Sequence, residues 1–193
     1  MKSERRESKI RSVLSRRQPG LTIVMENIHD PHNVSAMLRS ADAVGIHEVQ
    51  LVYTRQKFPK VGKKSSSSAN KWVERRRFDS IPACFETLRS EGFEIYATRL
   101  DPQAVSLYSL DLTKKCAFVF GNEHTGVSAE AASLADASIK IPMVGMIQSL
   151  NVSVACAVTL YEALRQRMAK KMYERPQFEA STFDQLLSDW LRK

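Results

Sequence analysis

Residues 141–155 read IPMVGMIQSLNVSVA, and this stretch passes from one kind of secondary structure to another. Ile141 to Met143 are typical of the end of an apolar strand, whereas the small and β-branched residues after Asn151 indicate a buried helix. Ser149 or Asn151 can cap that helix, because their side-chain oxygens accept hydrogen bonds from its first free N–H groups. A well-capped buried helix explains this pattern by itself. The pattern also leaves polar side chains at the end of a strand, where open α/β sheets bind ligands.

The sequence before this stretch alternates short apolar strands with amphipathic helices. Strands are predicted at 21–26, 48–52, 93–98, 116–120 and 138–143, and helices at 33–44, 80–90, 129–136 and 151–168. Asn33 is the predicted N-cap of the first of these helices, and Gly45 its end. Regular alternation implies right-handed β-α-β crossovers and therefore a mostly parallel sheet with helices on both faces. The predicted fold class is α/β.

Both ends of the chain carry helical patterns that lie outside this alternation. Residues 3–17 are rich in Arg and Lys and have apolar residues at helical spacing. Residues 181–193 begin with a capping-box pattern at Ser181 and Asp184, and their apolar stripe must pack on the body or on a partner subunit. The predicted divisions are a basic helix at 1–18, one domain at 19–168 and a helical extension at 169–193.

The formal net charge of +8 over 193 residues predicts an acidic partner, with nucleic acid ahead of a membrane surface. Cations gather in the N-terminal helix, in residues 55–77 and near residues 165–175. A charge run is more often a solvated face, yet three such segments, one with Trp72 and Phe78 among its cations, favour contacts with nucleic acid. The cations assigned to RNA are Arg11, Arg16, Arg17, Arg55, Lys57, Lys60, Lys63, Lys64, Arg165 and Lys170.

Cysteine usage and hydropathy indicate the compartment. The three cysteines are far apart and odd in number, as is typical of reduced thiols in a cytosolic protein. No apolar run approaches the roughly 18 residues of a membrane span, and the charged N-terminus lacks the apolar core of a signal peptide. His29 and His32 lie close together, but no cysteine or further histidine completes a metal site. We therefore expect a cytoplasmic protein with no membrane segment and no metal.

Two further features bear on a ligand site. Residues 120–126, FGNEHTG, follow a buried strand, and their glycines allow backbone amides to approach a ligand closely. The spacing is neither a P-loop nor a dinucleotide fingerprint, so an ordinary turn explains it equally well. Arg39 lies opposite the apolar stripe of its predicted helix, beside Ser35 and Ala36. This pattern favours a solvated residue, although a face of small residues also suits a second subunit.

Asn33 with Arg39, then FVFGNEHTG, then IPMVGMIQSLNVSVA resemble, in order and spacing, the three motifs of the SPOUT methyltransferases. They are most similar to the TrmH type, the tRNA guanosine 2′-O-methyltransferases, and the similarity covers about residues 8–175. The resemblance implies a deep trefoil knot within about residues 116–160, with S-adenosylmethionine bound in its loops. It also implies a homodimer in which the two knots pack together.

The resemblance implies roles for single residues as well. The cofactor pocket is expected to be lined by Thr98, Gly121, Ile141, Met143 and Leu150. The residues expected to act in catalysis or to shape the floor of the active site are Asn33, Arg39, Glu123, Ser149 and Asn151. Because a guanidinium rarely gives up its proton, we expect Arg39 chiefly to grip the adjacent RNA phosphate and hold the 2′-oxygen.

The TrmH-like pattern favours methylation of guanosine 18 in the D-loop of tRNA. Another tRNA ribose or ribosomal RNA is an alternative, although ribosomal members usually carry a separate domain before the first strand. A non-catalytic RNA-binding domain is the remaining alternative, and it predicts loss of polar motif residues that are all present here. The segment after Arg175 carries acidic residues where TrmH-like enzymes often have basic helices, which is a departure from the family pattern.

Overall fold

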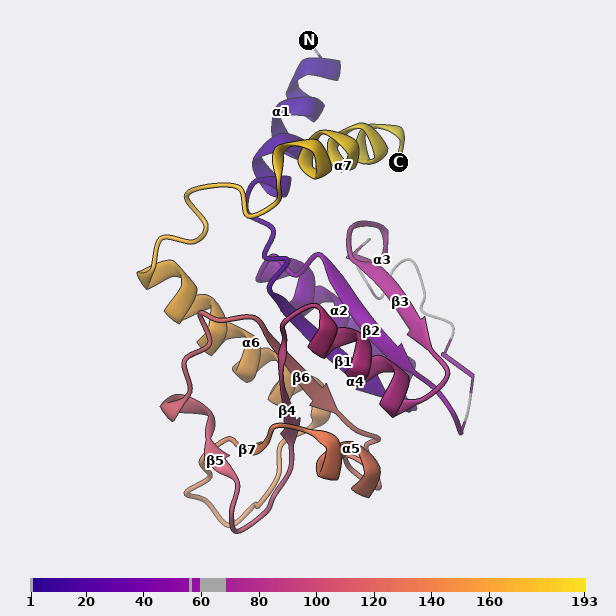
Figure 1. Cartoon of the computed structure of the whole chain (residues 1–193), viewed down its shortest axis with the longest axis vertical. Helices are drawn as coiled ribbons and strands as arrows, with labels where there is room; N and C mark the ends of the chain where they lie inside the picture. The colour runs from indigo at the N-terminus through magenta and orange to yellow at the C-terminus, as the bar shows by residue number, and fades with distance from the viewer. Residues whose placement is uncertain (1, 56, 60–68) are drawn as a thin grey trace.

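The computed structural model describes residues 2–55, 57–59 and 69–193, and these form a seven-stranded sheet flanked by helices (Figure 1). The strands are β1 (Leu21–Glu26), β2 (Glu48–Val52), β3 (Glu74–Phe78), β4 (Glu94–Thr98), β5 (Val105–Ser106), β6 (Cys116–Phe120) and β7 (Ala137–Lys140). They lie in the order β3-β2-β1-β6-β4-β7-β5, and every neighbouring pair is parallel. The predicted α/β class with a parallel sheet is confirmed.

Helices cover both faces of the sheet. The helices are α1 (Lys2–Leu14), α2 (Pro31–Ala43), α3 (Ala69–Trp72), α4 (Ile81–Ser90), α5 (Ala129–Leu134), α6 (Val152–Ala169) and α7 (Ala180–Arg192), with a 3-10 turn η1 (Leu107–Ser109). Buried side chains of α2 and α6 join one apolar cluster, and those of α4 and α5 join a second cluster on the opposite face. Figure 1 shows α4 in front of the central strands.

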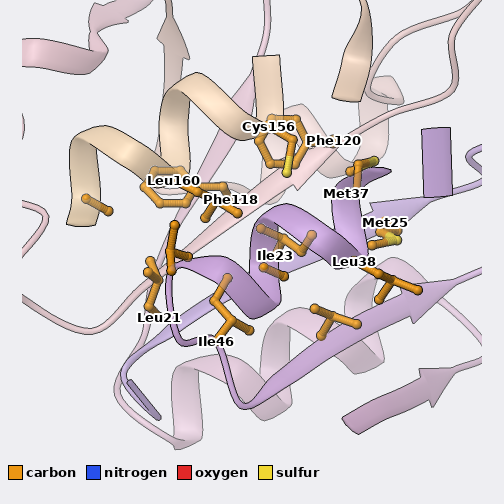
Figure 2. Close-up of a cluster of buried hydrophobic side chains, with 14 of the residues drawn as sticks. Leu21, Ile23, Met25, Met37, Leu38, Ile46, Phe118, Phe120, Cys156 and Leu160 are labelled. Atoms are coloured by element: carbon orange, nitrogen blue, oxygen red, sulfur yellow. The ribbon is translucent and has the colours of Figure 1, made fainter. Parts of the chain in front are cut away.

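Side chains alternate along β1 between these two clusters. Leu21, Ile23 and Met25 point toward α2 and α6, whereas Val24 points toward α4 and α5. Burying one such side chain stabilises the fold by about 1.5–3 kcal/mol, so the alternation fixes which face each helix covers. Figure 2 shows the first cluster, in which β1 meets Met37, Leu38, Phe118, Phe120, Cys156 and Leu160.

The first and last helices form a third apolar cluster apart from the sheet. Ile10 and Leu14 of α1 pack with Phe183, Leu187 and Trp190 of α7, and Figure 1 shows the two helices side by side above the sheet. The sequence left two partners open for the C-terminal stripe, the body or a second subunit, and within this chain the stripe packs on the N-terminal helix. We call these two helices the α1–α7 pair.

Arg17 connects the α1–α7 pair to the sheet domain. Its guanidinium donates to the backbone oxygen of Ile46 at 2.7 Å and to the carboxylate of Asp42 at 2.5 Å. The same group lies 5.1 Å from the ring centre of Trp190, at the cation–π distance. The prediction that Arg17 contacts RNA is wrong, because its side chain is 1% exposed and its donors face the protein interior.

Several predicted boundaries need correction. Asp30, not Asn33, caps α2, because its side chain accepts from the N–H of His32 and Pro31 opens the helix. Glu179 precedes α7 without a side-chain cap, so the capping box predicted at Ser181 is wrong. Strand β7 ends at Lys140, earlier than predicted.

Some elements were not predicted at all. Strand β3, ERRRF, is the edge strand beside β2 and is only partly buried. Because most of its residues are cations, the sequence indicated only a basic segment there. Strand β5 and turn η1 lie between the strands predicted at 93–98 and 116–120, where the sequence predicts no element. No helix of the described ranges is long and apolar enough to cross a membrane.

Candidate active site

A cavity of about 920 Å³ opens at the carboxyl ends of the central strands. Its walls come from the turns after β4 and β6, from the segment between β7 and α6, and from the first turns of α6. Parallel sheets bind ligands at this edge, because the strand ends leave backbone groups free to face a ligand. All the residues predicted to bind the cofactor line this cavity: Thr98, Gly121, Ile141, Met143 and Leu150.

The turn after β6 can take its shape only because of its glycines. A Cβ atom at Gly121 would lie 2.1 Å from the backbone of Gly126, which no side chain can tolerate. Gly126 has a φ of +69°, in the left-handed region that favours glycine. Inside the turn, Asn122 accepts hydrogen bonds from the N–H groups of His124 (2.9 Å) and Thr125 (3.3 Å). The FGNEHTG segment is therefore a tightly closed wall of the cavity.

Three polar residues from distant segments join beside this wall. Glu123 accepts hydrogen bonds from the backbone N–H groups of His29 (2.8 Å) and Asp30 (3.0 Å) and from the side chain of Asn33 (2.9 Å). The side-chain oxygen of Asn33 accepts from the amide of Asn151 at 3.1 Å. We call Glu123, Asn33 and Asn151 the polar triad. It ties the start of α2 and the start of α6 to the turn after β6.

Glu123 is held in its charged form. Burial acts to raise its pKa, but the hydrogen bonds from Asn33, His29 and Asp30 outweigh it, and the pKa lies below its ordinary value. Both carboxylate oxygens are occupied as acceptors. A carboxylate with a lowered pKa and occupied oxygens is a poor general base, so the geometry indicates that Glu123 organises the site.

Asn151 also caps α6. Its side-chain oxygen accepts from the N–H groups of Ser153 (2.9 Å) and Val154 (3.4 Å), which decides between the two predicted caps, Ser149 and Asn151. Ser149 lies on the cavity wall. At α2 the cap is Asp30, so the side chain of Asn33 is available to donate to Glu123.

Arg39 is not brought together with the other predicted catalytic residues within one chain. It is exposed on α2 and is not among the residues lining the cavity. Asn33, from the same helix, is buried and reaches the cavity only through Glu123 and Asn151. Within one chain, the side chain of Arg39 therefore does not contribute to the cavity.

The cations predicted to contact RNA fall into three groups. Those exposed on the surface are Arg11, Arg16, Arg55, Lys57, Arg165 and Lys170. Arg165 is partly neutralised, because its guanidinium donates to both oxygens of Glu162 at 2.8 Å. Arg55 lies on the cavity wall. Lys60, Lys63 and Lys64 lie outside the described residues, and Arg17 is buried as described above.

Among the cavity residues that sequence reasoning missed, three carry groups able to bind a ligand. Arg99 and Lys140 line it and bring positive charge to the ends of β4 and β7. Thr159 also lines it, is 0% exposed, and its hydroxyl has no hydrogen-bond partner among the described residues. The only signal in the sequence was a hydroxyl within an otherwise apolar stretch of helix. A buried unpaired hydroxyl beside a cavity suits a polar group on a ligand.

The fold and this edge cavity define the class: the chain belongs to the SpoU rRNA Methylase family, whose model matches residues 20–161. A tRNA (guanosine(18)-2′-O)-methyltransferase of Thermus thermophilus is 47% identical over 192 residues, covering 100% of this chain and 98% of the relative. The TrmH/SpoU tRNA modifying enzyme of A. aeolicus, a crystal structure, is 38% identical with a TM-score of 0.93, covering 100% of this chain and 98% of that chain.

S-adenosylmethionine is the cofactor of this family. AviRb from Streptomyces viridochromogenes, solved in complex with AdoMet, is 26% identical with a TM-score of 0.68, covering 80% of this chain and 62% of that chain. The cavity fits such a ligand on two observations of its own. Its volume of about 920 Å³ lies within the range of about 300–1,000 Å³ that is usual for pockets of small-molecule ligands and cofactors. The hydroxyl of Thr159, which has no partner among the described residues, is available for a hydrogen bond to a ligand or a water.

Proposed function

We propose that this protein methylates the 2′-hydroxyl of guanosine 18 in the D-loop of tRNA. The observation that carries the proposal is the polar triad at the wall of the cavity, because it fixes three distant segments around one reaction site. The relatives named above as tRNA enzymes match this chain along its whole length. Exposed cations around the same molecule suit the phosphates of a folded RNA.

The residues of the chain divide the work as follows. When bound, S-adenosylmethionine supplies a methyl group on its sulfonium sulfur for transfer to the ribose oxygen. The residues that would hold it line the cavity: Thr98, Gly121, Ile141, Met143 and Leu150. The polar triad and Ser149 keep the two reactants aligned, which is the main requirement of an in-line displacement. Because Glu123 is committed as an acceptor, the proton of the 2′-hydroxyl leaves to water or to the neighbouring phosphate.

The enzyme acts as a homodimer in this proposal. Val154, Tyr161 and Met168 recur every seventh residue along α6 and are 47%, 51% and 60% exposed, which leaves an apolar stripe uncovered in one chain. Such a stripe marks an interface. A second copy covers it, and Arg39 then reaches the cavity of the partner subunit and grips the phosphate beside the target ribose.

The dimer can be tested by mixing two inactive variants, Arg39→Ala and Asn151→Ala. Restored methyl transfer in the mixture supports sharing of residues between subunits, because one cavity then contains both native residues. A mixture as inactive as its components, in a sample that light scattering shows to be dimeric, would contradict the placement of Arg39.

Residues 116–160 form a deep trefoil knot in this proposal. Strand β7 pairs with β4 on the far side of β6, whereas α6, which follows β7 in the chain, returns to pack over β1 and β6. That return path requires the segment between β7 and α6 to pass the turn after β6, beside which Asn151 bonds Asn33. The enzyme works in the cytoplasm, which agrees with three free cysteines among the described residues.

The decisive experiment incubates the purified protein with unmodified tRNA transcripts and labelled S-adenosylmethionine, followed by nuclease digestion to locate the methyl group. Label on the ribose of guanosine 18 supports the proposal. Label on another ribose, in tRNA or ribosomal RNA, would keep the methyltransferase and replace its target. Absence of label from every RNA, with cofactor binding intact, would favour a non-catalytic RNA-binding protein.

A further inference from the structure

Asn27, directly after β1, has an unusual backbone conformation. Its φ is +50°, in the left-handed region that few residues other than glycine adopt without strain. Asparagine tolerates this region better than most, because its short side chain can bond to nearby backbone groups. Here the side chain bonds to the segment that follows β2. The left-handed turn therefore serves to aim a side chain rather than only to bend the chain.

The side chain of Asn27 holds the segment that leaves β2. Its oxygen accepts hydrogen bonds from the backbone N–H groups of Thr54 (3.0 Å) and Arg55 (3.1 Å), and its amide donates to the hydroxyl of Thr54 at 3.4 Å. The backbone N–H of Asn27 donates to the oxygen of Val52 at 3.0 Å. The pairing of β1 with β2 thus continues beyond the end of the strands, up to Arg55.

The backbone of Asn27 is fixed from the other side by the turn after β6. Its carbonyl oxygen accepts from the side chain of Asn122 at 2.9 Å. Asn122 and Arg55 both line the cavity, and Asn27 lies between them because β1 lies between β2 and β6. One asparagine therefore sets where Arg55 stands relative to the turn that carries Glu123.

Arg55 is suited to bind an anion at the mouth of the cavity. It is exposed, and no carboxylate of the described residues forms an ion pair with it. A guanidinium in this state binds phosphate with two hydrogen bonds, provided that its backbone is held in place. Arg55 and Glu123 line the same cavity, so a nucleotide whose ribose enters it brings its phosphates close to this group of residues.

We propose that Asn27 is a positioning residue for the RNA substrate: it holds Arg55 at the rim of the cavity so that the guanidinium binds the phosphate beside the methylated ribose. The inference rests on the proposed function. The inference gives Asn27 no contact with the cofactor. Its bond to Asn122, in the turn after β6, uses the backbone carbonyl oxygen, and every substitution of Asn27 retains that oxygen.

The first test compares Asn27→Gly with Asn27→Asp. Glycine accepts the left-handed φ but removes the two acceptor bonds, whereas aspartate keeps an oxygen for the N–H groups of Thr54 and Arg55. We expect Asn27→Gly to raise the KM for tRNA about tenfold, mainly from loss of the two bonds to the backbone of Thr54 and Arg55, and Asn27→Asp to stay within about threefold of the native protein. The Kd for S-adenosylmethionine, measured by calorimetry, should change by less than about twofold in both variants.

The second test is a double-mutant cycle with Arg55→Gln. If Asn27 acts through Arg55, then Asn27→Gly has no further effect on tRNA affinity once Arg55 is replaced, and the double variant is about tenfold weaker rather than about a hundredfold. Additive effects would overturn the inference. So would equal losses of cofactor and tRNA affinity in Asn27→Gly, since these indicate general loosening of the fold.

Failure of the inference about Asn27 can be distinguished from failure of the proposed function. If the native protein leaves tRNA unmethylated, the proposed function fails, and the cycle is then measured as binding of tRNA alone. If the native protein methylates tRNA and Asn27→Gly matches it in KM, only the inference about Asn27 fails. Thermal unfolding of each variant shows whether it is folded.

Discussion

The polar edge of the sheet and the α1–α7 pair both join segments that are distant in sequence, but they do so by different interactions. At the edge, the polar triad joins three segments by hydrogen bonds around a cavity. In the α1–α7 pair, apolar side chains from both ends of the chain bury one another, and the buried Arg17 fastens them to the sheet domain. We expect substitutions at the edge to alter chemistry and substitutions in the pair to alter stability.

Replacing Trp190 tests this contrast with the largest effect. Trp190 is 1% exposed and lies against both Arg17 and Trp72. Trp190→Ala should lower the free energy of unfolding of the α1–α7 pair by about 3–5 kcal/mol, because a large cavity forms and Arg17 loses its aromatic contact. Amide hydrogen exchange of α7 measures the loss, and Thr182→Ala, exposed on the same helix, is the control. Cofactor affinity that fell in parallel would show that the two regions are not separate.

Replacing Glu123 is the reciprocal change at the edge. Glu123→Gln keeps the size of the side chain but turns one acceptor into a donor that faces a backbone N–H of the 29–30 segment. The rate of methyl transfer should fall about 10- to 100-fold, the range of one or two lost charge-assisted hydrogen bonds, with little change in thermal stability. Glu130→Gln, exposed on α5, is the matched control. An unchanged rate would show that the carboxylate of Glu123 is not needed for methyl transfer.

Acid should weaken the α1–α7 pair through His47, which packs edge-on against Phe178 beside that pair. Burial, and then the charge of Arg17, lower the pKa of His47 from 6.5 to about 4, although Glu74 opposes them. The unfolded chain therefore binds an extra proton between about pH 6.5 and 4, and stability is lost as the pH falls through this window.

The slope from this one group is at most about 1.4 kcal/mol per pH unit. His47→Phe keeps a ring against Phe178 and should remove this component of the acid dependence, measured by denaturant unfolding at several pH values. His124→Gln, in the turn after β6, should retain it. A native slope that persists in His47→Phe would assign the acid sensitivity to other groups.

The smallest expected effect concerns the cofactor. Thr159→Val keeps the shape of the side chain and removes the buried hydroxyl that has no partner among the described residues. If a ligand completes that hydrogen bond, the Kd for S-adenosylmethionine should rise about three- to tenfold, whereas Thr159→Ser should stay close to the native value. Calorimetry measures both. Tighter binding in Thr159→Val would show that the hydroxyl faces no polar group of the cofactor.

Features that depend on local chemistry were predictable from the sequence. Apolar strands such as CAFVF and the left-handed Gly45 at the end of α2 follow from neighbouring residues, and the cap of α6 was narrowed to Ser149 or Asn151. Features that depend on distant partners were not. The charge of Arg17 indicated a surface residue, yet its partners Asp42 and Trp190 come from other helices and bury it.

The site shows the same division. The motif residues lining the cavity could be assigned by resemblance, whereas their connections could not. Asn33 looked like a cap, because only the structure reveals that Asp30 fills that role and that Asn33 faces Glu123. Asn27 and Thr159 gave almost no signal, since a left-handed φ and an unpaired hydroxyl are properties of the folded chain.

The chain contains two tryptophans, and both lie where α7 meets the sheet domain, with ring centres 5.1 Å apart. Its intrinsic tryptophan fluorescence is therefore a local reporter. An emission change on heating, or on adding tRNA, reports on the docking of α7, whereas events confined to the cavity leave the emission unchanged. A fluorescence response to S-adenosylmethionine alone would accordingly be a direct optical sign of long-range coupling between the cofactor and the ends of the chain.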